Sequence, residues 1–437
     1  MSLAMSLRGR GPVGSAARTA RVLSRFGATV SGMARRLDRY EAITSQLGIR
    51  PSWPTTACVL ARHPDLLRRY AERGAELALH GLVHGDHAAL DRRQQREAIA
   101  RAADVFDRFG VPATGFRGPY LRYNDATLEV LREMGFRYDS TQAVIFPSGD
   151  GEREARAAPG YALALKLYSP LDARTVAVIP RLRDRLVRIP VALPDDEILV
   201  ERLKLGEPAA TAEWLGVLDF TYERGDLFTM QLHPERIREL GQALSVTLTE
   251  ACRRRPSIFL ARLDEIASWW LRRSRFSLQV VRREEERYHV HLEADEDATL
   301  LVRGLDVPRT QWHGRDSICD LHDFDLESPR APLVGISPRS PVAIASFLAE
   351  EGLPFEASDE REAFGAYVDV AQADWTESEV LDAIEEGPGP LVRLWRWPKD
   401  ARSALAVTGD VDALTLRDFL VRTWETRSPE RGGWQLA

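Results

Sequence analysis

The sequence contains few cysteines and no long apolar run. Only three cysteines occur among its 437 residues, at Cys58, Cys252 and Cys319, and they form no Cys-x-x-Cys pair. This excludes a thiolate zinc site of the usual spacing. No segment is long and apolar enough to cross a bilayer, and the basic N-terminal stretch lacks the apolar run of a signal peptide. We therefore expect a cytoplasmic protein without a transmembrane segment.

An excess of one charge is also missing. The chain has 59 Lys and Arg residues against 65 Asp and Glu residues, which gives a net charge of -6. The N-terminal stretch is rich in arginine, but no lysine and arginine tract indicates a nucleic-acid surface. We expect no nucleic-acid partner. The length and the 44% hydrophobic content leave room for about two or three globular domains, and no feature indicates an oligomeric state.

The first two thirds of the chain alternate between helical and strand-like segments. Apolar residues at helical spacing predict helices such as "DLLRRYAERG" and "TAEWLGVLDFTYERG". Short apolar runs between the helices predict strands, among them "AELALH", "ATGFRGPY" and "LFTMQLH". The run "TTACVLA" around Cys58 is also strand-like and predicts a buried thiol. Repeated strand and helix units favour an α/β fold with a parallel sheet, open or closed as a barrel.

Composition changes near Ser274. Segment 276–335 alternates apolar and polar residues with period two, which predicts a small antiparallel β domain. Segment 336–400 returns to helix and strand patterns and predicts a small α+β domain. Segment 401–437 contains an apolar strand, an acidic turn and a helix. The main α/β domain accordingly covers residues 1–275.

The stretch "ELALHGLVHGDH" concentrates three of the nine histidines, at His80, His84 and His87. If the chain turns after His80, the imidazoles of His80 and His84 project to one side. That arrangement suits a divalent metal held by two imidazoles and a carboxylate. The alternative is a polar loop with solvated histidines. The motifs "RGPY", "LH" and "GDVD" also end apolar strands, and such ends share one rim in a parallel sheet.

These motifs together resemble the polysaccharide deacetylases of carbohydrate esterase family four. The family pattern has an aspartate pair after the first strand, a His-x-x-x-His motif, an Arg-x-Pro-aromatic motif and a later Leu-x-His-type motif. Here "HGLVH", "RGPY" and "LH" follow in that order, and the resemblance covers roughly residues 30 to 275. One departure is Gly81, where the family has serine or threonine.

A larger departure concerns the aspartate pair, which should precede "HGLVH". No strand before that motif ends in such a pair, whereas "ALAVTGDVDALT" near the far end carries Asp410 and Asp412. We therefore predict a circularly permuted (β/α) deacetylase-type barrel, whose first strand comes from segment 401–437. Chain termini often lie close together, which makes such a rearrangement physically easy. The alternative is that "GDVD" forms a turn in a separate domain and that the barrel is catalytically inactive.

The resemblance implies a metal centre. Its ligands would be Asp412, His80 and His84, with zinc as the expected ion. Asp410 would be the base that takes a proton from water at the metal. Two neutral imidazoles and one carboxylate leave a divalent ion net positive, so it lowers the pKa of water and polarises an amide carbonyl.

The resemblance also implies the remaining catalytic roles. His233 would protonate the departing amine, and the backbone N–H of Tyr120 would stabilise the oxyanion. Arg117 would hold Asp410 by a bidentate contact. Asp139 in "YDST" would orient the acid histidine. Outside this set, His289 and His291 lie two apart on one strand face, and we expect that face to be solvated.

Three functions fit these features. The first is a metal-dependent hydrolase that removes the acetyl group from an N-acetylated sugar or glycoconjugate. The second is an amidase of the same fold that acts on a non-sugar amide or ureide, since fold does not fix substrate. The third is an inactive carbohydrate-binding protein. The complete set of ligand and acid-base positions favours an enzyme over an inactive carbohydrate-binding protein.

Overall fold

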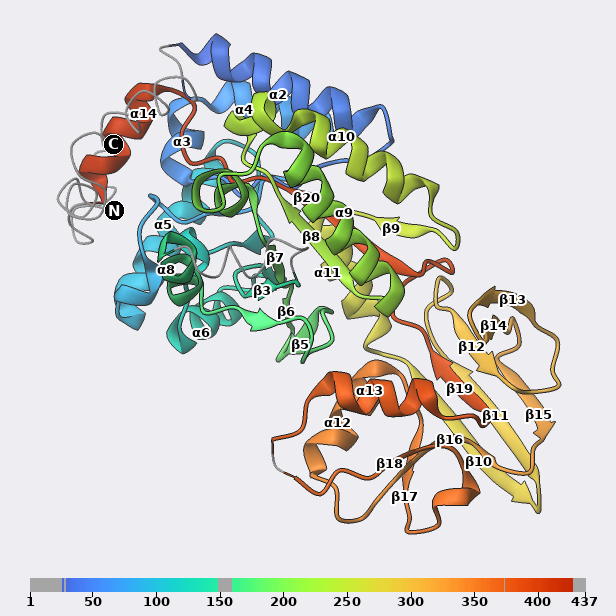
Figure 1. Cartoon of the computed structure of the whole chain (residues 1–437). Helices are drawn as coiled ribbons and strands as arrows, with labels where there is room; N and C mark the ends of the chain where they lie inside the picture. Colours follow the sequence, from blue (N-terminus) through green and yellow to red (C-terminus); the bar gives the residue numbers. More distant parts are fainter. Residues whose placement is uncertain (1–25, 27–28, 148–158, 373, 427–437) are drawn as a thin grey trace.

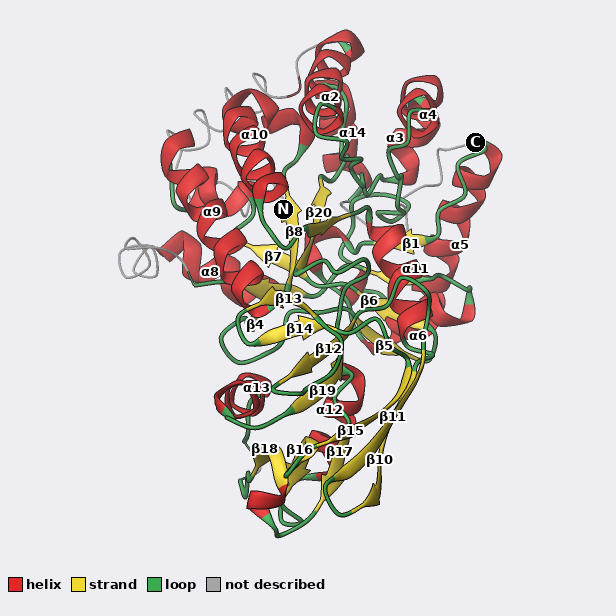
Figure 2. Ribbon diagram, turned by 90° about the vertical axis from the view of Figure 1, so that its right-hand side faces the viewer, coloured by secondary structure: helices red, strands yellow, loops and turns green. Residues whose placement is uncertain are grey.

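The computed structural model describes residues 26, 29–147, 159–372 and 374–426. Its larger part alternates helices and strands, and its smaller part is rich in strands (Figures 1 and 2). The helices of the larger part are α2 (Val30–Ser45), α3 (Ala57–Arg62), α4 (Pro64–Glu72), α5 (Arg92–Arg108), α6 (Asp125–Glu133), α8 (Pro159–Tyr168), α9 (Glu207–Arg224), α10 (Ile237–Arg253), α11 (Leu263–Arg273) and α14 (Leu416–Glu425). None of the described helices is long and apolar enough to span a membrane.

The strands of the larger part are short. They are β1 (Gly115–Phe116), β2 (Tyr138–Asp139), β3 (Ala143–Ile145), β4 (Leu171–Asp172), β5 (Arg181–Arg183), β6 (Leu186–Arg188), β7 (Val191–Leu193), β8 (Leu227–Gln231), β9 (Ile258–Leu260) and β20 (Ser403–Thr408). Most pairs are parallel, which agrees with the predicted α/β class. The strands belong to separate small sheets, so the predicted barrel is not one continuous hydrogen-bonded ring among the described residues.

Strand β20 lies inside the larger part although it comes from the far end of the chain. It pairs in parallel with β8 on one side and with β9 on the other. Beyond the end of β9, segment 52–55 is the neighbour of β20 on this side, with bridges from Ser52 to Thr408 and from Thr55 to Val411. All six residues of β20 are buried, in agreement with the four apolar residues that lie between Ser403 and Thr408.

Parallel pairing brings several strand ends to one edge. Segment 52–55 bridges to segment 76–79, and Leu79 bridges to Phe116 at the end of β1. The residues that directly follow β20, β8, β1 and segment 76–79 therefore share an edge, as expected for the carboxyl ends of parallel strands.

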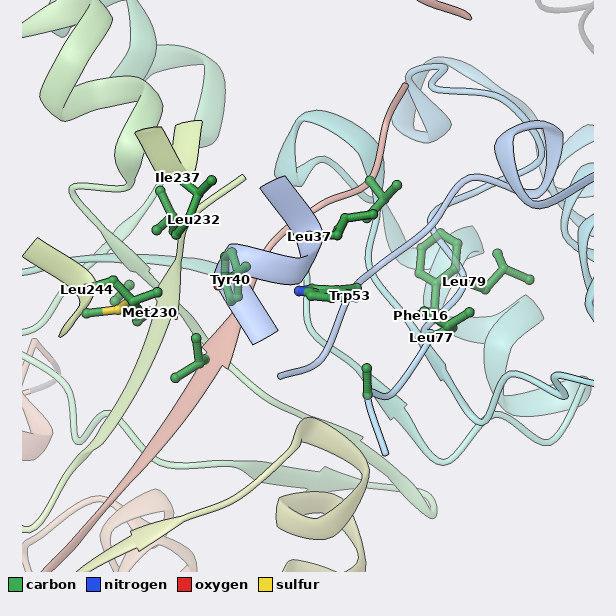
Figure 3. Packing of buried hydrophobic residues seen from close by; sticks show 14 of the residues in the cluster. Leu37, Tyr40, Trp53, Leu77, Leu79, Phe116, Met230, Leu232, Ile237 and Leu244 are labelled. Atoms are coloured by element: carbon green, nitrogen blue, oxygen red, sulfur yellow. The ribbon is translucent and has the colours of Figure 1, made fainter. Parts of the chain in front are cut away.

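A cluster of buried aromatic side chains surrounds Trp53 of segment 52–55. Trp53 packs edge-on against Tyr40 of α2 and Tyr70 of α4, with ring centroids 5.7 and 5.3 Å apart. Figure 3 shows Trp53 between this helix and the side chains of Leu79 and Phe116. The Tyr40 hydroxyl donates to the backbone oxygen of Thr408, so α2 is tied to the last residue of β20.

Helix ends follow local sequence signals. Helix α14 begins after Thr415, whose side chain accepts from the Asp418 N–H while Asp418 reaches back to the Thr415 N–H. Helix α9 ends at Gly225, which has a φ of 69°. Segment 55–61 differs from its prediction, because Ala57–Arg62 form helix α3. Cys58 is buried as expected.

Among its described residues, the smaller part contains three sheets and two α-helices. Its strands are β10 (Ser277–Glu284), β11 (Arg287–Glu293), β12 (Leu300–Arg303), β13 (Thr310–His313), β14 (Asp316–Ile318), β15 (Asp323–Glu327), β16 (Ala331–Ile336), β17 (Phe355–Ala357), β18 (Phe364–Val368) and β19 (Leu391–Leu394), and its helices are α12 (Val342–Glu351) and α13 (Glu377–Glu386). Strands β10 and β11 form the expected hairpin. Pairing of β12 with β19, and of β16 with β17 and β18, connects residues on both sides of the predicted boundary at 335/336.

Candidate metal centre

Two histidines and one aspartate converge at the shared strand edge. The Nε2 atom of His80 lies 3.4 Å from Oδ1 of Asp412, and Nε2 of His84 lies 3.2 Å from Oδ2 of the same carboxylate. The three candidate ligand atoms lie within 4.8 Å of one another. His80 and His84 are buried, and the side chain of Asp412 is 11% exposed. The structure thus brings two neighbouring histidines to an aspartate that lies more than three hundred positions away in the sequence.

The tautomer of His80 follows from its second nitrogen. Its Nδ1 atom lies 2.8 Å from the backbone oxygen of Arg117, and a carbonyl oxygen only accepts, so Nδ1 carries the proton. When His80 is neutral, its Nε2 atom presents a lone pair toward Asp412. Neither His80 Nε2 nor Asp412 Oδ1 has a hydrogen-bond partner among the described residues. Buried polar atoms rarely stay unpaired, and a divalent cation would supply the missing partner of both.

The second histidine also has the charge state that a ligand needs. Burial lowers the pKa of His84 well below its usual value, against the opposing effect of Asp412. The imidazole is therefore neutral near pH 7 and its Nε2 is available to a metal. Asp412 has a further partner, because Arg422 of α14 donates to its Oδ2 at 2.7 Å. The sequence analysis did not identify Arg422, which has no motif around it.

Asp410 is held beside the metal ligands by two side chains. Arg117 NH1 donates to Oδ1 at 3.1 Å, and Gln231 Nε2 donates to Oδ2 at 3.1 Å. The predicted bidentate contact of Arg117 is wrong, because only one of its N–H groups reaches Asp410. The others bond to Ser140 oxygens, and NH1 also reaches Thr408 Oγ1. Both carboxylate oxygens of Asp410 are thereby oriented, one by Arg117, which follows β1, and the other by Gln231 at the end of β8.

His233 follows β8 and contacts an aspartate that was not predicted. Its Nδ1 atom lies 2.7 Å from Oδ1 of Asp196, whose Oδ2 is 2.9 Å from Nε of Arg236. Burial opposes protonation of His233, but the Asp196 carboxylate outweighs it and raises the pKa of His233 well above its usual value. His233 is close enough to Asp410 for their charges to interact. The group can therefore donate a proton at neutral pH.

The prediction that Asp139 orients the acid histidine is wrong. Asp139 is buried, accepts from the Thr141 hydroxyl and lies 3.6 Å from Nε of Arg188. Asp196 takes the predicted position beside His233. The signal was present in the sequence, because "PDD" directly follows the apolar strand β7.

Tyr120 packs against His84. Its ring packs edge-on against the imidazole with centroids 4.3 Å apart, and its backbone has a φ of 60°. The left-handed conformation at Tyr120 is uncommon for a non-glycine residue and costs energy that the surrounding structure must offset. Preceding Gly118 is required, because a Cβ there would lie 2.6 Å from the Arg122 oxygen.

Gly81 is a structural requirement as well as a departure from the family pattern. Its φ is +81°, and a Cβ would meet His87 Nε2 at 2.9 Å and Val83 O at 3.0 Å. Glycine permits this backbone at no steric cost. Serine or threonine at this position would be strained, so the loop between His80 and His84 follows a path suited to glycine.

The neighbouring residues of the motif lie outside the ligand set. His87 is buried with its ring 5.4 Å from that of Phe116. Asp86 accepts from the N–H of Ala88 and pairs with Arg122 at 2.9 Å. The exposed group His289, His291 and Asp323, on β11 and β15, also has ligand atoms close enough for a metal.

Comparison with known proteins agrees with these motifs. Residues 44–138 match the family model described as polysaccharide deacetylase. A peptidoglycan deacetylase-like protein from Gibberella zeae is 27% identical over 134 residues, which are 30% of this chain and 40% of that protein. The chain therefore spans less than half of this relative's length.

Solved structures with a similar arrangement include a crystal structure assigned to the polysaccharide deacetylases, from Mycobacterium smegmatis. It is 21% identical with a TM-score of 0.43, covering 54% of this chain and 76% of the other. A crystal structure of an allantoinase is 18% identical with a TM-score of 0.42, covering 54% and 72%. The stretch 44–138 that matches the polysaccharide deacetylase family model includes "HGLVH" and "RGPY".

Proposed function

We propose that the protein is a metal-dependent hydrolase that removes the acetyl group from an N-acetylated sugar or glycoconjugate. The convergence of His80 Nε2, His84 Nε2 and the Asp412 carboxylate within 4.8 Å carries this proposal. Zinc is the expected ion, because two imidazoles and one carboxylate are a common ligand set of catalytic zinc. When bound, such an ion acts as a Lewis acid toward water and toward a carbonyl oxygen.

The remaining residues divide the proton transfers between them. Asp410 accepts the proton of the attacking water, and Arg117 and Gln231 keep its carboxylate oriented for this step. His233 donates a proton to the departing amine nitrogen, because an unprotonated amide nitrogen is a poor leaving group. The raised pKa of His233 keeps it protonated before the reaction. The backbone N–H of Tyr120 stabilises the oxyanion, a role assigned from the family resemblance.

We also propose that the domain is circularly permuted, with β20 as its first strand. The support is that β20 pairs in parallel with β8 and β9, and that Asp410 and Asp412 follow it at the edge where His80 begins the metal motif.

Two substitutions test the function. Asp412→Asn keeps the size of the side chain but removes a negative ligand, so bound zinc and acetate release should both fall. Asp410→Asn removes the base only, so zinc content should stay near one ion per chain while acetate release falls by about two to four orders of magnitude. Zinc content is measured by elemental analysis, and acetate release with an N-acetylglucosamine oligosaccharide.

The same assay separates the alternatives. An amidase acting on a ureide would hydrolyse a carbon–nitrogen bond of that substrate with the gain of one carboxylate, and would release no acetate from the oligosaccharide, with the same dependence on both aspartates. Unchanged zinc content and activity in both variants would contradict the proposed centre.

A further inference from the structure

The two carboxylate oxygens of Asp412 have different surroundings. Oδ2 accepts from Nη1 of Arg422 at 2.7 Å and lies 3.2 Å from Nε2 of His84. Oδ1 lies 3.4 Å from Nε2 of His80 and has no hydrogen-bond partner among the described residues. One oxygen is therefore engaged by a cation of the protein, and the other is left for an ion held by the histidines.

Helix α14 places Arg422 at the metal centre through the spacing of its charged residues. Asp418, Arg422 and Glu425 lie four and three positions apart, so they share one face of the helix. Glu425 pairs with Arg62 at the end of α3, beside which α14 lies in Figure 1. Asp418 lies 2.9 Å from Nε2 of His63. These pairs hold the two ends of the face, and Arg422 lies between them.

The other face of α14 is exposed. Leu420 and Trp424 are 59% and 49% exposed. Arg417 is also exposed and forms no ion pair with the described residues. By contrast, the side chain of Arg422 is only 20% exposed, and its guanidinium lies 5.0 Å from the ring centroid of Phe419. Two arginines of one helix therefore differ in whether they contact the metal centre.

The charge of Arg422 has two consequences for a divalent ion at this site. A cation beside the ligand carboxylate repels a second cation, which lowers the affinity for the ion. The hydrogen bond to Oδ2 also draws electron density from the carboxylate, so the carboxylate donates less to the ion and leaves it a stronger Lewis acid. Arg422 therefore opposes tight binding of the ion and favours catalysis.

We infer that Arg422 is a positioning residue, which engages Oδ2 of Asp412 and leaves Oδ1 as the oxygen that binds the metal ion. The carboxylate then fills one coordination position, and the open position of a catalytic site stays available to water and to the substrate. Without Arg422, both oxygens are free to approach the ion. The inference rests on the proposed function, because it concerns the same zinc and the same reaction.

The test compares two arginines of α14. Arg422→Met keeps an unbranched side chain next to Phe419 but removes the charge and the donors. We expect zinc to bind about tenfold more tightly and kcat for acetate release to fall about tenfold, the lower end of effects from groups that contact metal ligands. Arg422→Lys keeps the charge and an N–H donor and should return both quantities toward the wild type. Arg417→Met is the matched control and should change neither.

Zinc affinity is measured by competition with a chromophoric chelator, which requires no substrate. If Arg422→Met does not fold, as judged by circular dichroism, Arg422→Gln takes its place. An arginine that only stabilised the fold would lower zinc affinity and kcat together when replaced. Any result other than tighter binding with slower turnover in a folded variant would overturn the inference.

Failure of the proposed function gives a different result. A wild type that binds zinc but releases no acetate would contradict the deacetylation, while the zinc affinities would still report on the role of Arg422. A wild type that binds no zinc would overturn both the metal centre and the role of Arg422. If the wild type binds zinc and releases acetate, and Arg422→Met behaves like Arg417→Met, the inference alone fails.

Discussion

Two groups of two histidines and one aspartate occur in the described part of the chain, and they differ in almost everything except composition. His80, His84 and Asp412 are brought together by β20 from opposite ends of the sequence, whereas His289, His291 and Asp323 come from adjacent strands. The first group is buried. In the second, the side chains of His291 and Asp323 are 40% and 64% exposed.

The difference teaches that ligand identity and proximity do not suffice to mark a metal centre. In the exposed group Nδ1 of His291 lies 2.7 Å from Asp323, and this hydrogen bond raises the pKa of His291. The imidazole is thereby disposed to hold a proton. In the buried group, burial lowers the pKa of His84, and His80 Nε2 has no hydrogen-bond partner among the described residues. The pKa of His80 is raised as well, because Asp410 and Asp412 outweigh the effect of burial. The buried group therefore differs in the burial of its ligand atoms and in the absence of a hydrogen-bond partner for His80 Nε2 and Asp412 Oδ1 among the described residues.

The largest expected effect comes from removing the strand that connects the buried group. Deletion of residues 403–437 takes away β20, which is buried along its whole length and flanked by β8 and β9. The exposed edges and the lost core contacts should abolish cooperative unfolding of the α/β part. The measurement is thermal unfolding by circular dichroism. A truncated protein that unfolds cooperatively and keeps its zinc would contradict the central position of β20.

Single substitutions then compare the two groups directly. His80→Ala removes a buried ligand and should release the zinc and reduce acetate release by at least about a hundredfold. His289→Ala removes the equivalent histidine of the exposed group and should leave zinc content and activity unchanged. Elemental analysis after dialysis measures both. Equal loss of zinc in the two variants would show that the exposed group also holds a metal.

The sequence predicted the ligands better than their supports. The histidines, "RGPY" and "GDVD" each follow an apolar strand, and parallel strands place such ends at one edge. Pairing of β20 with β8 and segment 52–55 then buries a strand that has four apolar residues between Ser403 and Thr408. This explains why Asp410 and Asp412 could be related to His80 and His84 across most of the chain.

Contacts made by isolated side chains were not predictable in the same way. Asp139 has the expected motif around it, yet its carboxylate accepts from Thr141, while Asp196 contacts His233. Which aspartate contacts His233 depends on the path of the chain after β7. The local sequence pattern does not give the distance between these side chains.

A smaller effect is expected at His233, the proposed acid. Asp196 raises the pKa of His233 against the effect of burial. Asp196→Asn should therefore lower that pKa by about 1 to 3 units. Because the protonated form donates the proton, activity should begin to fall at lower pH on the alkaline side of the profile, with zinc content unchanged. Asp139→Asn is the control and should leave the alkaline limb in place. A reversed result would restore Asp139 as the orienting aspartate.

The smallest expected effect concerns His87, the third histidine of the buried motif. Burial lowers its pKa to about 4, below the value of roughly 6.5 in the unfolded chain. As pH falls through that interval, the unfolded state takes up a proton that the folded state does not, so the free energy of unfolding decreases. The loss is about 2 kcal/mol by pH 5 and negligible above pH 7. His87→Phe, which keeps a ring beside Phe116, should remove this dependence.

Exposed His291 should act with the opposite sign. Its raised pKa means that the folded state holds the proton more firmly, so acidification below the unfolded pKa adds stability, and the contribution is lost as pH rises through the folded pKa. Urea unfolding of the wild type, His87→Phe and His291→Phe at pH 5 and pH 7 separates the two. The metal centre is common to all three proteins, so its own pH dependence cancels in the differences. If His87→Phe loses as much stability on acidification as the wild type, burial of a neutral His87 is not the cause.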